Sequence, residues 1–98
     1  MKRRLGYNEW RMENGERVIR VEVRLYATLR KYQPEGKVGE ALVCELAEGT
    51  ILQKFLEKEL GVPPGEVKTV FVNGVSQSSD YVLADGDRVG IFPPIAGG

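Results

Sequence analysis

Apolar and polar residues alternate along several stretches of this chain, which is the pattern of a half-buried β-strand. In residues 18–26 every second residue is apolar, with charged residues between. Residues 40–46 and 88–92 also alternate, the first with Leu42, Cys44 and Leu46 on one face and the second with Val89 and Ile91 inward. Residues 67–72 form another apolar run, ending at the hairpin signal Asn73-Gly74. The pattern therefore predicts four strands.

Between the predicted strands of residues 40–46 and 67–72, the apolar residues recur with the period of a helix. Ile51, Leu52, Phe55, Leu56 and Leu60 recur at helical spacing. Thr50 followed by Gln53 matches a capping box, while Gly61 and Pro63-Pro64 end the run. These signals predict one amphipathic helix of about ten residues. A shorter helical turn is expected over residues 27–32, followed by a loop over residues 33–37.

Residues 1–17 form a polar N-terminal extension that is either an arm or an extra strand. Asn14-Gly15 is a strong hairpin turn, and it would set Trp10 opposite Ile19 and Glu9 opposite Arg20. We favour the strand, because Trp10 would then lie on the apolar face of the next strand. A functional site is not expected here.

The order of these elements predicts an α+β fold with a mixed sheet and one main helix packed across it. A chain of 98 residues holds one small domain with a single core. We expect this domain to span residues 18–92 and to be followed by a flexible tail, residues 93–98.

Composition excludes several classes of chemistry. The chain has no histidine and one cysteine, so it cannot build a histidine-based triad, a zinc site or a four-cysteine cluster. Cys44 is interpreted as a small core residue, and the hydroxyls of residues 76–79 have no histidine to activate them. Fourteen basic and fourteen acidic residues balance, and no stretch is long enough to span a membrane. We therefore expect a soluble, cytoplasmic protein without a nucleic-acid or membrane partner and without a bound metal or cofactor.

The tail is the most distinctive segment of the sequence. It reads Phe92-Pro93-Pro94-Ile95-Ala96-Gly97-Gly98. Paired prolines favour a stiff, extended exit, and two glycines without Cβ atoms can thread a narrow channel. From Ile95 to Gly98 the tail would reach roughly 13 Å when extended. A terminal carboxylate needs activation, and the chain lacks a phosphate-binding glycine loop, so an activating partner is required.

The tail and several internal motifs resemble the small, sulfur-carrying subunit of molybdopterin synthase (MoaD-like), in the ubiquitin-like carrier family that also includes ThiS. The resemblance extends from about Val18 to the tail. It includes the internal motifs RLYATLRKY (24–32), VNG (72–74), LADGD (83–87) and DGDRVGI (85–91). The tail sequence FPPIAGG is the most specific of these matches. The N-terminal extension is longer than this family's core pattern requires.

The resemblance implies a ubiquitin-like β-grasp, in which the strands of residues 18–26 and 88–92 run parallel side by side. Tyr26 and Phe92 would then be neighbours on the solvent side of the sheet and form a partner-binding patch with Pro93, Pro94, Ile95, Ala96 and Gly97. Burial of either ring is the alternative, because alternation often ends where a strand does.

The family's chemistry would fall on Gly98. An E1-like enzyme (MoeB-like) would use Mg-ATP to adenylate its carboxylate, and a persulfide donor would convert the adenylate to a thiocarboxylate. A large synthase subunit (MoaE-like) would receive the tail and use the sulfur to build molybdopterin. The chain itself would not be an enzyme. Alternatives are a sulfur carrier for thiazole (ThiS-like) or for a tungsten cofactor, a ubiquitin-like protein modifier, and an interaction module whose glycine tail is incidental.

Overall fold

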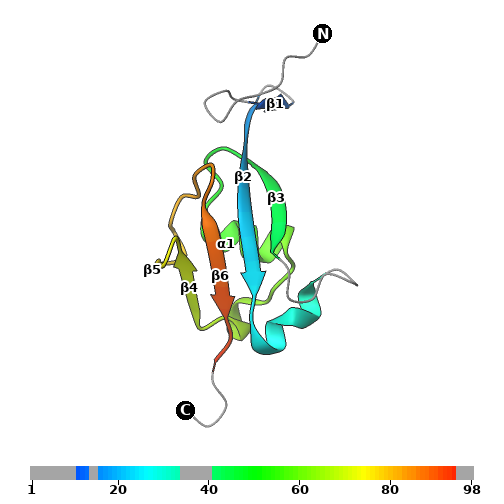
Figure 1. Cartoon of the computed structure of the whole chain (residues 1–98), viewed down its shortest axis with the longest axis vertical. Coiled ribbons are helices and arrows are strands. Elements are labelled where there is room, and N and C mark those ends of the chain that lie inside the picture. Colours follow the sequence, from blue (N-terminus) through cyan, green and yellow to red (C-terminus); the bar gives the residue numbers. More distant parts are fainter. Residues whose placement is uncertain (1–10, 14–15, 34–40, 95–98) are drawn as a thin grey trace.

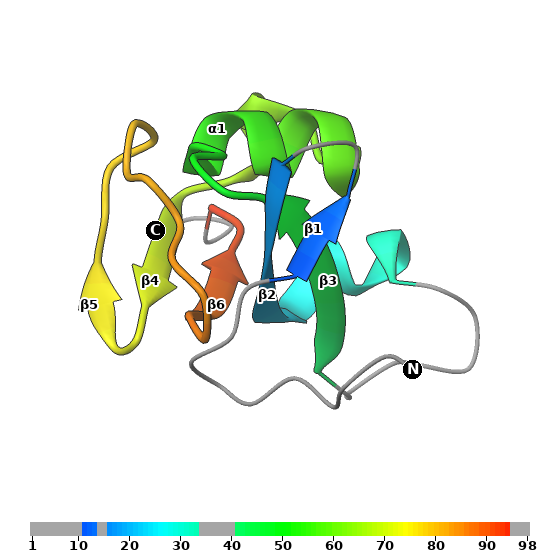
Figure 2. The same cartoon turned by 90° about the horizontal axis from the view of Figure 1, so that it is seen from above.

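The computed structural model describes residues 11–13, 16–33 and 41–94. It contains a mixed β-sheet with a helical segment packed on one face (Figures 1 and 2). The strands follow the order β1-β2-β6-β4-β5, and β3 pairs with β2. The strands are β1 (Arg11–Glu13), β2 (Glu16–Leu25), β3 (Leu42–Ala47), β4 (Thr69–Val72), β5 (Val75–Ser76) and β6 (Arg88–Phe92), and the helical elements are η1 (Ala27–Tyr32), α1 (Leu52–Lys54), η2 (Phe55–Glu59) and η3 (Pro64–Glu66).

The long strand β2 lies at the centre of the sheet. It pairs antiparallel with β3 and parallel with β6, where Leu25 lies opposite Ile91. The predicted alternation is confirmed, because Ile19, Val21, Val23 and Leu25 are buried against the helical layer while the residues between them are exposed. The expected α+β class and β-grasp topology are therefore confirmed.

Strand β1 pairs antiparallel with the start of β2, and Arg11 lies opposite Val18. This register is the one set by a turn at Asn14-Gly15, although the turn itself, Glu9 and Trp10 lie outside the described residues. Further along β2, the N–H of Arg20 donates to Asp85 Oδ1 at 2.8 Å, and its carbonyl accepts from the Gly86 N–H at 2.8 Å. The edge of β2 beside β1 is thus occupied by the 85–86 turn from Arg20 onward.

The amphipathic helix forms, but its geometry and its N-terminus differ from the prediction. One α-helical turn, α1, continues into the wider π-helical turn η2, where the Leu60 N–H donates to the Phe55 carbonyl at 3.1 Å. The expected capping box is wrong, since Ile51 is the N-cap and has no side-chain cap bond. Carbonyls from the loop after β5 accept the first helical N–H groups instead: Tyr81 from Leu52, and Ser79 from Gln53.

Strands β4 and β5 form the hairpin that Asn73-Gly74 predicts, with both turn residues at positive φ (54° and 83°). Beside the turn lies a buried carboxylate, Asp87, which is 5% exposed. Its oxygens accept hydrogen bonds of 2.9 Å from Asn73 Nδ2, from the Tyr81 hydroxyl and from the Ala84 N–H. Burial and the bond to Asp87 raise the pKa of Tyr81. Asp87 thus joins the hairpin to the segment that leads into β6.

Replacing Asp87 tests how much this junction contributes to the stability of the fold. The substitution Asp87→Ala leaves three donors without their acceptor, so we expect it to lower the free energy of unfolding by about 3 kcal/mol. The matched control Asp80→Ala changes an exposed carboxylate and should shift it by less than about 0.5 kcal/mol. Urea unfolding followed by circular dichroism measures both, and equal effects would contradict a structural role for Asp87.

Candidate functional site

Tyr26 and Phe92 form a stacked pair where the parallel strands β2 and β6 end. Tyr26 directly follows β2, and its N–H donates to the Ile91 carbonyl at 3.1 Å, so it lies beside Phe92, the last residue of β6. Their ring centroids are 4.3 Å apart and the ring planes differ by 2°. Each ring is half-buried. The expected adjacency is confirmed.

Two further residues shape this pair. Gly90 lies beneath it, because a Cβ at this position would stand 3.4 Å from Tyr26 Cε2 and 3.5 Å from Phe92 Cε1. Phe71 on β4 lies opposite Gly90 in the strand register and meets the Phe92 ring edge-on, with centroids 5.7 Å apart. Sequence reasoning did not single out Phe71, which is 38% exposed. Its position between Val70 and Val72, which both face inward, is the sequence signal that would have placed Phe71 on the outer face.

The aromatic cluster of Tyr26, Phe71 and Phe92 lies on the sheet face opposite the helix. A shallow hollow of about 490 Å³ surrounds it, and Glu22, Arg24 and Arg88 line its charged side. All three charged residues are exposed. An apolar centre with a polar border is typical of a protein-binding surface.

The root of the tail is held by backbone contacts. The Phe92 carbonyl accepts from the Lys68 N–H at 2.8 Å, and Phe92 lies opposite Thr69 in the β4–β6 register. Pro93 is half-buried and Pro94 is exposed. The chain thus leaves the sheet at the end of β6 (Figure 1). Phe92, the last residue of this strand, belongs to the aromatic cluster. Ile95, Ala96, Gly97 and Gly98 lie outside the described residues.

Other reactive side chains lie elsewhere. Cys44 on β3 packs against the core, and burial, with a smaller contribution from Glu59, raises the pKa of its thiol. A thiol with a raised pKa stays protonated near neutral pH and is a weak nucleophile. Within residues 11–13, 16–33 and 41–94, no group of three metal-ligating side chains is found. In the same part of the chain, no helix is long and apolar enough to cross a bilayer.

The parallel pair of β2 and β6 and the single helical layer define a ubiquitin-like β-grasp fold, and the aromatic cluster lies at the root of its tail. The chain belongs to the Mut7-C ubiquitin family, whose model matches residues 12–96. A search of curated proteins gave no match. The family match thus covers most of the chain.

Solved structures of similar proteins agree with this assignment. A Pyrococcus furiosus protein, named as subunit 1 of a molybdopterin converting factor, is 29% identical, with a TM-score of 0.59 over 79% of this chain and 99% of its own. The Haloferax volcanii HVO 2177 protein is 27% identical, with a TM-score of 0.61 over 92% of this chain and 96% of its own. SAMP1 of the same organism shares the fold at 20% identity, with a TM-score of 0.59 over 81% of this chain and 99% of its own. The chain is thus similar to small ubiquitin-like proteins of the carrier and modifier class.

Substitutions at Gly90 test whether this glycine allows the rings to stack on the sheet. A Cβ fits at ordinary contact distance, so Gly90→Ala should keep the stacked pair, whereas the branched side chain of Gly90→Val should displace it. NMR ring-current shifts of Tyr26 and Phe92 report the stacking. Hydrogen-exchange protection of β2 amides serves as the control for an intact sheet. Retained ring shifts in the valine variant would show that the pair does not depend on Gly90.

Proposed function

We propose that this protein is a sulfur carrier that presents Gly98 as a thiocarboxylate for molybdopterin biosynthesis. The observation that carries the proposal is the aromatic cluster fixed at the root of a Pro-Pro…Gly-Gly tail. The cluster offers a partner an apolar docking surface, while the tail that starts beside it can enter the partner's active site. Binding energy on the folded domain would thus position a slim, reactive end.

The carrier residue requires chemistry that partners supply. An oxygen of the Gly98 carboxylate attacks the α-phosphorus of ATP on an E1-like (MoeB-like) enzyme, which forms the acyl-adenylate and releases pyrophosphate. The terminal sulfur of a persulfide then attacks the acyl carbon and AMP leaves. A thiol cleaves the resulting acyl disulfide and becomes oxidised, which leaves the thiocarboxylate. Gly97 acts as the spacer in the channel, and Phe92 to Ala96 form the docking segment.

The choice of the molybdopterin pathway rests on the similar Pyrococcus furiosus protein, which is 29% identical to this chain. That protein is named as subunit 1 of a molybdopterin converting factor, which supports transfer of the sulfur to a pterin precursor on a large, MoaE-like synthase subunit. In this role the protein is the sulfur-donating subunit of a sulfurtransferase and contributes no acid or base of its own.

A ubiquitin-like protein modifier is the second candidate. SAMP1 proteins, described as small archaeal modifier proteins, share this fold, and an adenylated Gly98 could equally acylate a lysine amine. The two functions share the activation step and differ in the nucleophile. They are therefore separable by the product that forms.

Intact-mass spectrometry after incubation with an E1-like enzyme, Mg-ATP and a persulfide donor tests the carrier function. We expect a mass gain equal to the replacement of one oxygen by sulfur, and no gain in a chain that ends at Gly97. Isopeptide conjugates to added protein, without a thiocarboxylate, would favour the modifier. An unchanged mass with an enzyme that activates a known carrier would overturn both.

Docking through the aromatic cluster has its own test. Tyr26→Ala removes one of the stacked rings and should lower the rate of adenylation about tenfold, since apolar anchors dominate such interfaces. Lys54→Ala, on the helical side of the sheet, is the control and should leave the rate unchanged. Pyrophosphate release measures the rate. Equal rates in the two variants would place docking elsewhere.

A further inference from the structure

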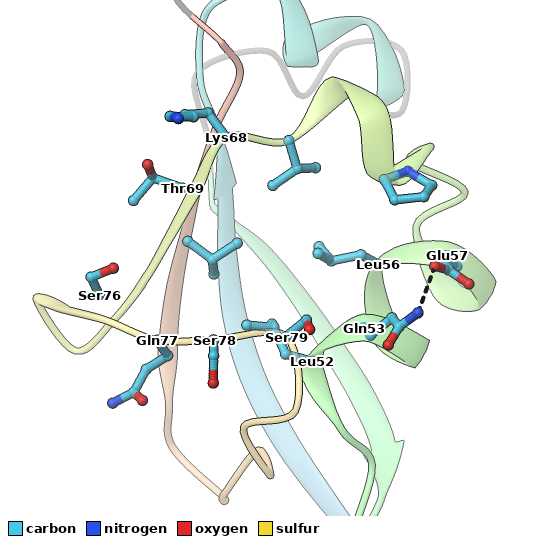
Figure 3. A pocket seen from close by; sticks show the side chains of 13 residues that line it. Leu52, Gln53, Leu56, Glu57, Lys68, Thr69, Ser76, Gln77, Ser78 and Ser79 are labelled. Carbon is cyan, nitrogen blue, oxygen red and sulfur yellow. Dashed lines mark hydrogen bonds between the residues drawn. The ribbon is translucent and has the colours of Figure 1, made fainter.

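The two faces of the sheet differ in where their charges lie. On the helical side, in the groove between the helix and the β4–β5 hairpin, Glu57 accepts a hydrogen bond from Gln53 at 3.2 Å, and the Lys68 side chain points away from the groove (Figure 3). On the outer face, Arg24 and Arg88 line the hollow around the aromatic cluster, and both are exposed. These two arginines are therefore the cations that a partner at the aromatic cluster meets.

Neither arginine has an acidic partner within the part of the chain that the structure describes. Arg20, on the same outer face of β2, shows the contrast, because its guanidinium lies 3.4 Å from Glu45 Oε2. Glu22 lies opposite Arg88 in the β2–β6 register and lines the same hollow, yet it forms no ion pair with either arginine. Both guanidinium groups are therefore available to a carboxylate from another molecule.

The sheet fixes the positions of the two arginines relative to each other. Arg24 lies opposite Gly90 in the β2–β6 register, and Arg88 lies two residues before Gly90 on β6, so the two arginines are diagonal neighbours on adjacent strands. The backbone of Arg88 is also held by Asn73, since its N–H donates to Asn73 Oδ1 at 2.9 Å and its carbonyl accepts from the Asn73 N–H at 2.8 Å. The spacing of the two arginines is thus set before any partner binds.

Arginines beside aromatic rings form a combination that protein interfaces use for their strongest contacts. Tyrosine and arginine are enriched among the residues that dominate binding energy. A planar guanidinium can donate two parallel hydrogen bonds to one carboxylate, which gives orientation as well as affinity. In this hollow the two arginines outnumber the single acidic lining residue, Glu22, so positive charge is in excess. Charge complementarity therefore favours an acidic partner surface.

We propose that Arg24 and Arg88 bind carboxylates on the activating enzyme that lie beside its apolar contact with the aromatic cluster. The rings of Tyr26 and Phe92 supply the apolar contact, and the two guanidinium groups fix the orientation of the enzyme over it. The inference rests on the proposed function, in which an E1-like enzyme docks at this cluster. It adds the charge of the enzyme's docking surface and the two residues that recognise it.

Steady-state adenylation of the full chain by an E1-like enzyme of the same organism tests this recognition, with pyrophosphate release as the readout. Arg24→Gln combined with Arg88→Gln should lower kcat/KM at least about tenfold through KM, while kcat is unchanged because the tail is untouched. Higher ionic strength should lower kcat/KM for the unsubstituted protein and much less for the double variant. Equal kcat/KM in the two proteins would overturn this inference alone.

Two matched controls separate local recognition from net charge. Lys54→Gln combined with Lys58→Gln also removes two positive charges, at exposed lysines that do not line the hollow, and should leave kcat/KM unchanged. Glu22→Gln neutralises the acid inside the hollow and should raise kcat/KM about twofold. Hydrogen-exchange protection of β2 amides shows whether the sheet is intact in each variant. A similar loss in the lysine variant, or a loss in Glu22→Gln, would contradict the proposal.

Lysine at both arginine positions tests whether the arginines pair with carboxylates. The double variant Arg24→Lys with Arg88→Lys keeps the charge but lacks the planar fork of donors, so it should retain the salt dependence without the full kcat/KM. Full kcat/KM in this variant would mean attraction by charge without paired carboxylates, and the proposal would be wrong. No adenylation of the unsubstituted chain, by an enzyme that adenylates a known carrier, would overturn the proposed function and this inference with it.

Discussion

The parallel pairing of β2 with β6 is the constraint on which the rest of this molecule depends. It joins strands that are distant in sequence and brings their carboxyl ends together, with Leu25 opposite Ile91. The next residue of each strand, Tyr26 and Phe92, is therefore placed beside the other, and their rings stack above Gly90. A pairing in the core thus fixes the place from which the tail leaves the domain.

The sheet separates two kinds of surface. One face carries the helical layer and most of the buried apolar side chains, while the other carries aromatic rings among exposed charges. Gly90 and Phe71 show how closely strand register governs the outer face, because one supplies the space for the rings and the other supports the edge of Phe92.

Sequence patterns predicted the strands well because burial on one face of a sheet imposes a period of two on the apolar residues. Val21 and Val23 follow this period and are both buried. They also predicted the neighbouring positions of Tyr26 and Phe92, once a parallel pairing was assumed. The capping box failed because backbone carbonyls of Ser79 and Tyr81 took the donors that Thr50 was expected to satisfy. Such tertiary replacement of a local signal is invisible in a short window of sequence. The role of Phe71 was missed for a related reason, since it depends on a partner strand.

The bonds from Leu52 and Gln53 to Tyr81 and Ser79 also bear on how the domain is made. The first turn of the helix obtains its hydrogen-bond acceptors from a loop that is synthesised much later. During translation these two hydrogen bonds therefore cannot form until residues 79–81 have left the ribosome. The contact is non-local, and such contacts slow folding. Formation of the helix start should consequently be a late event in the folding of the domain.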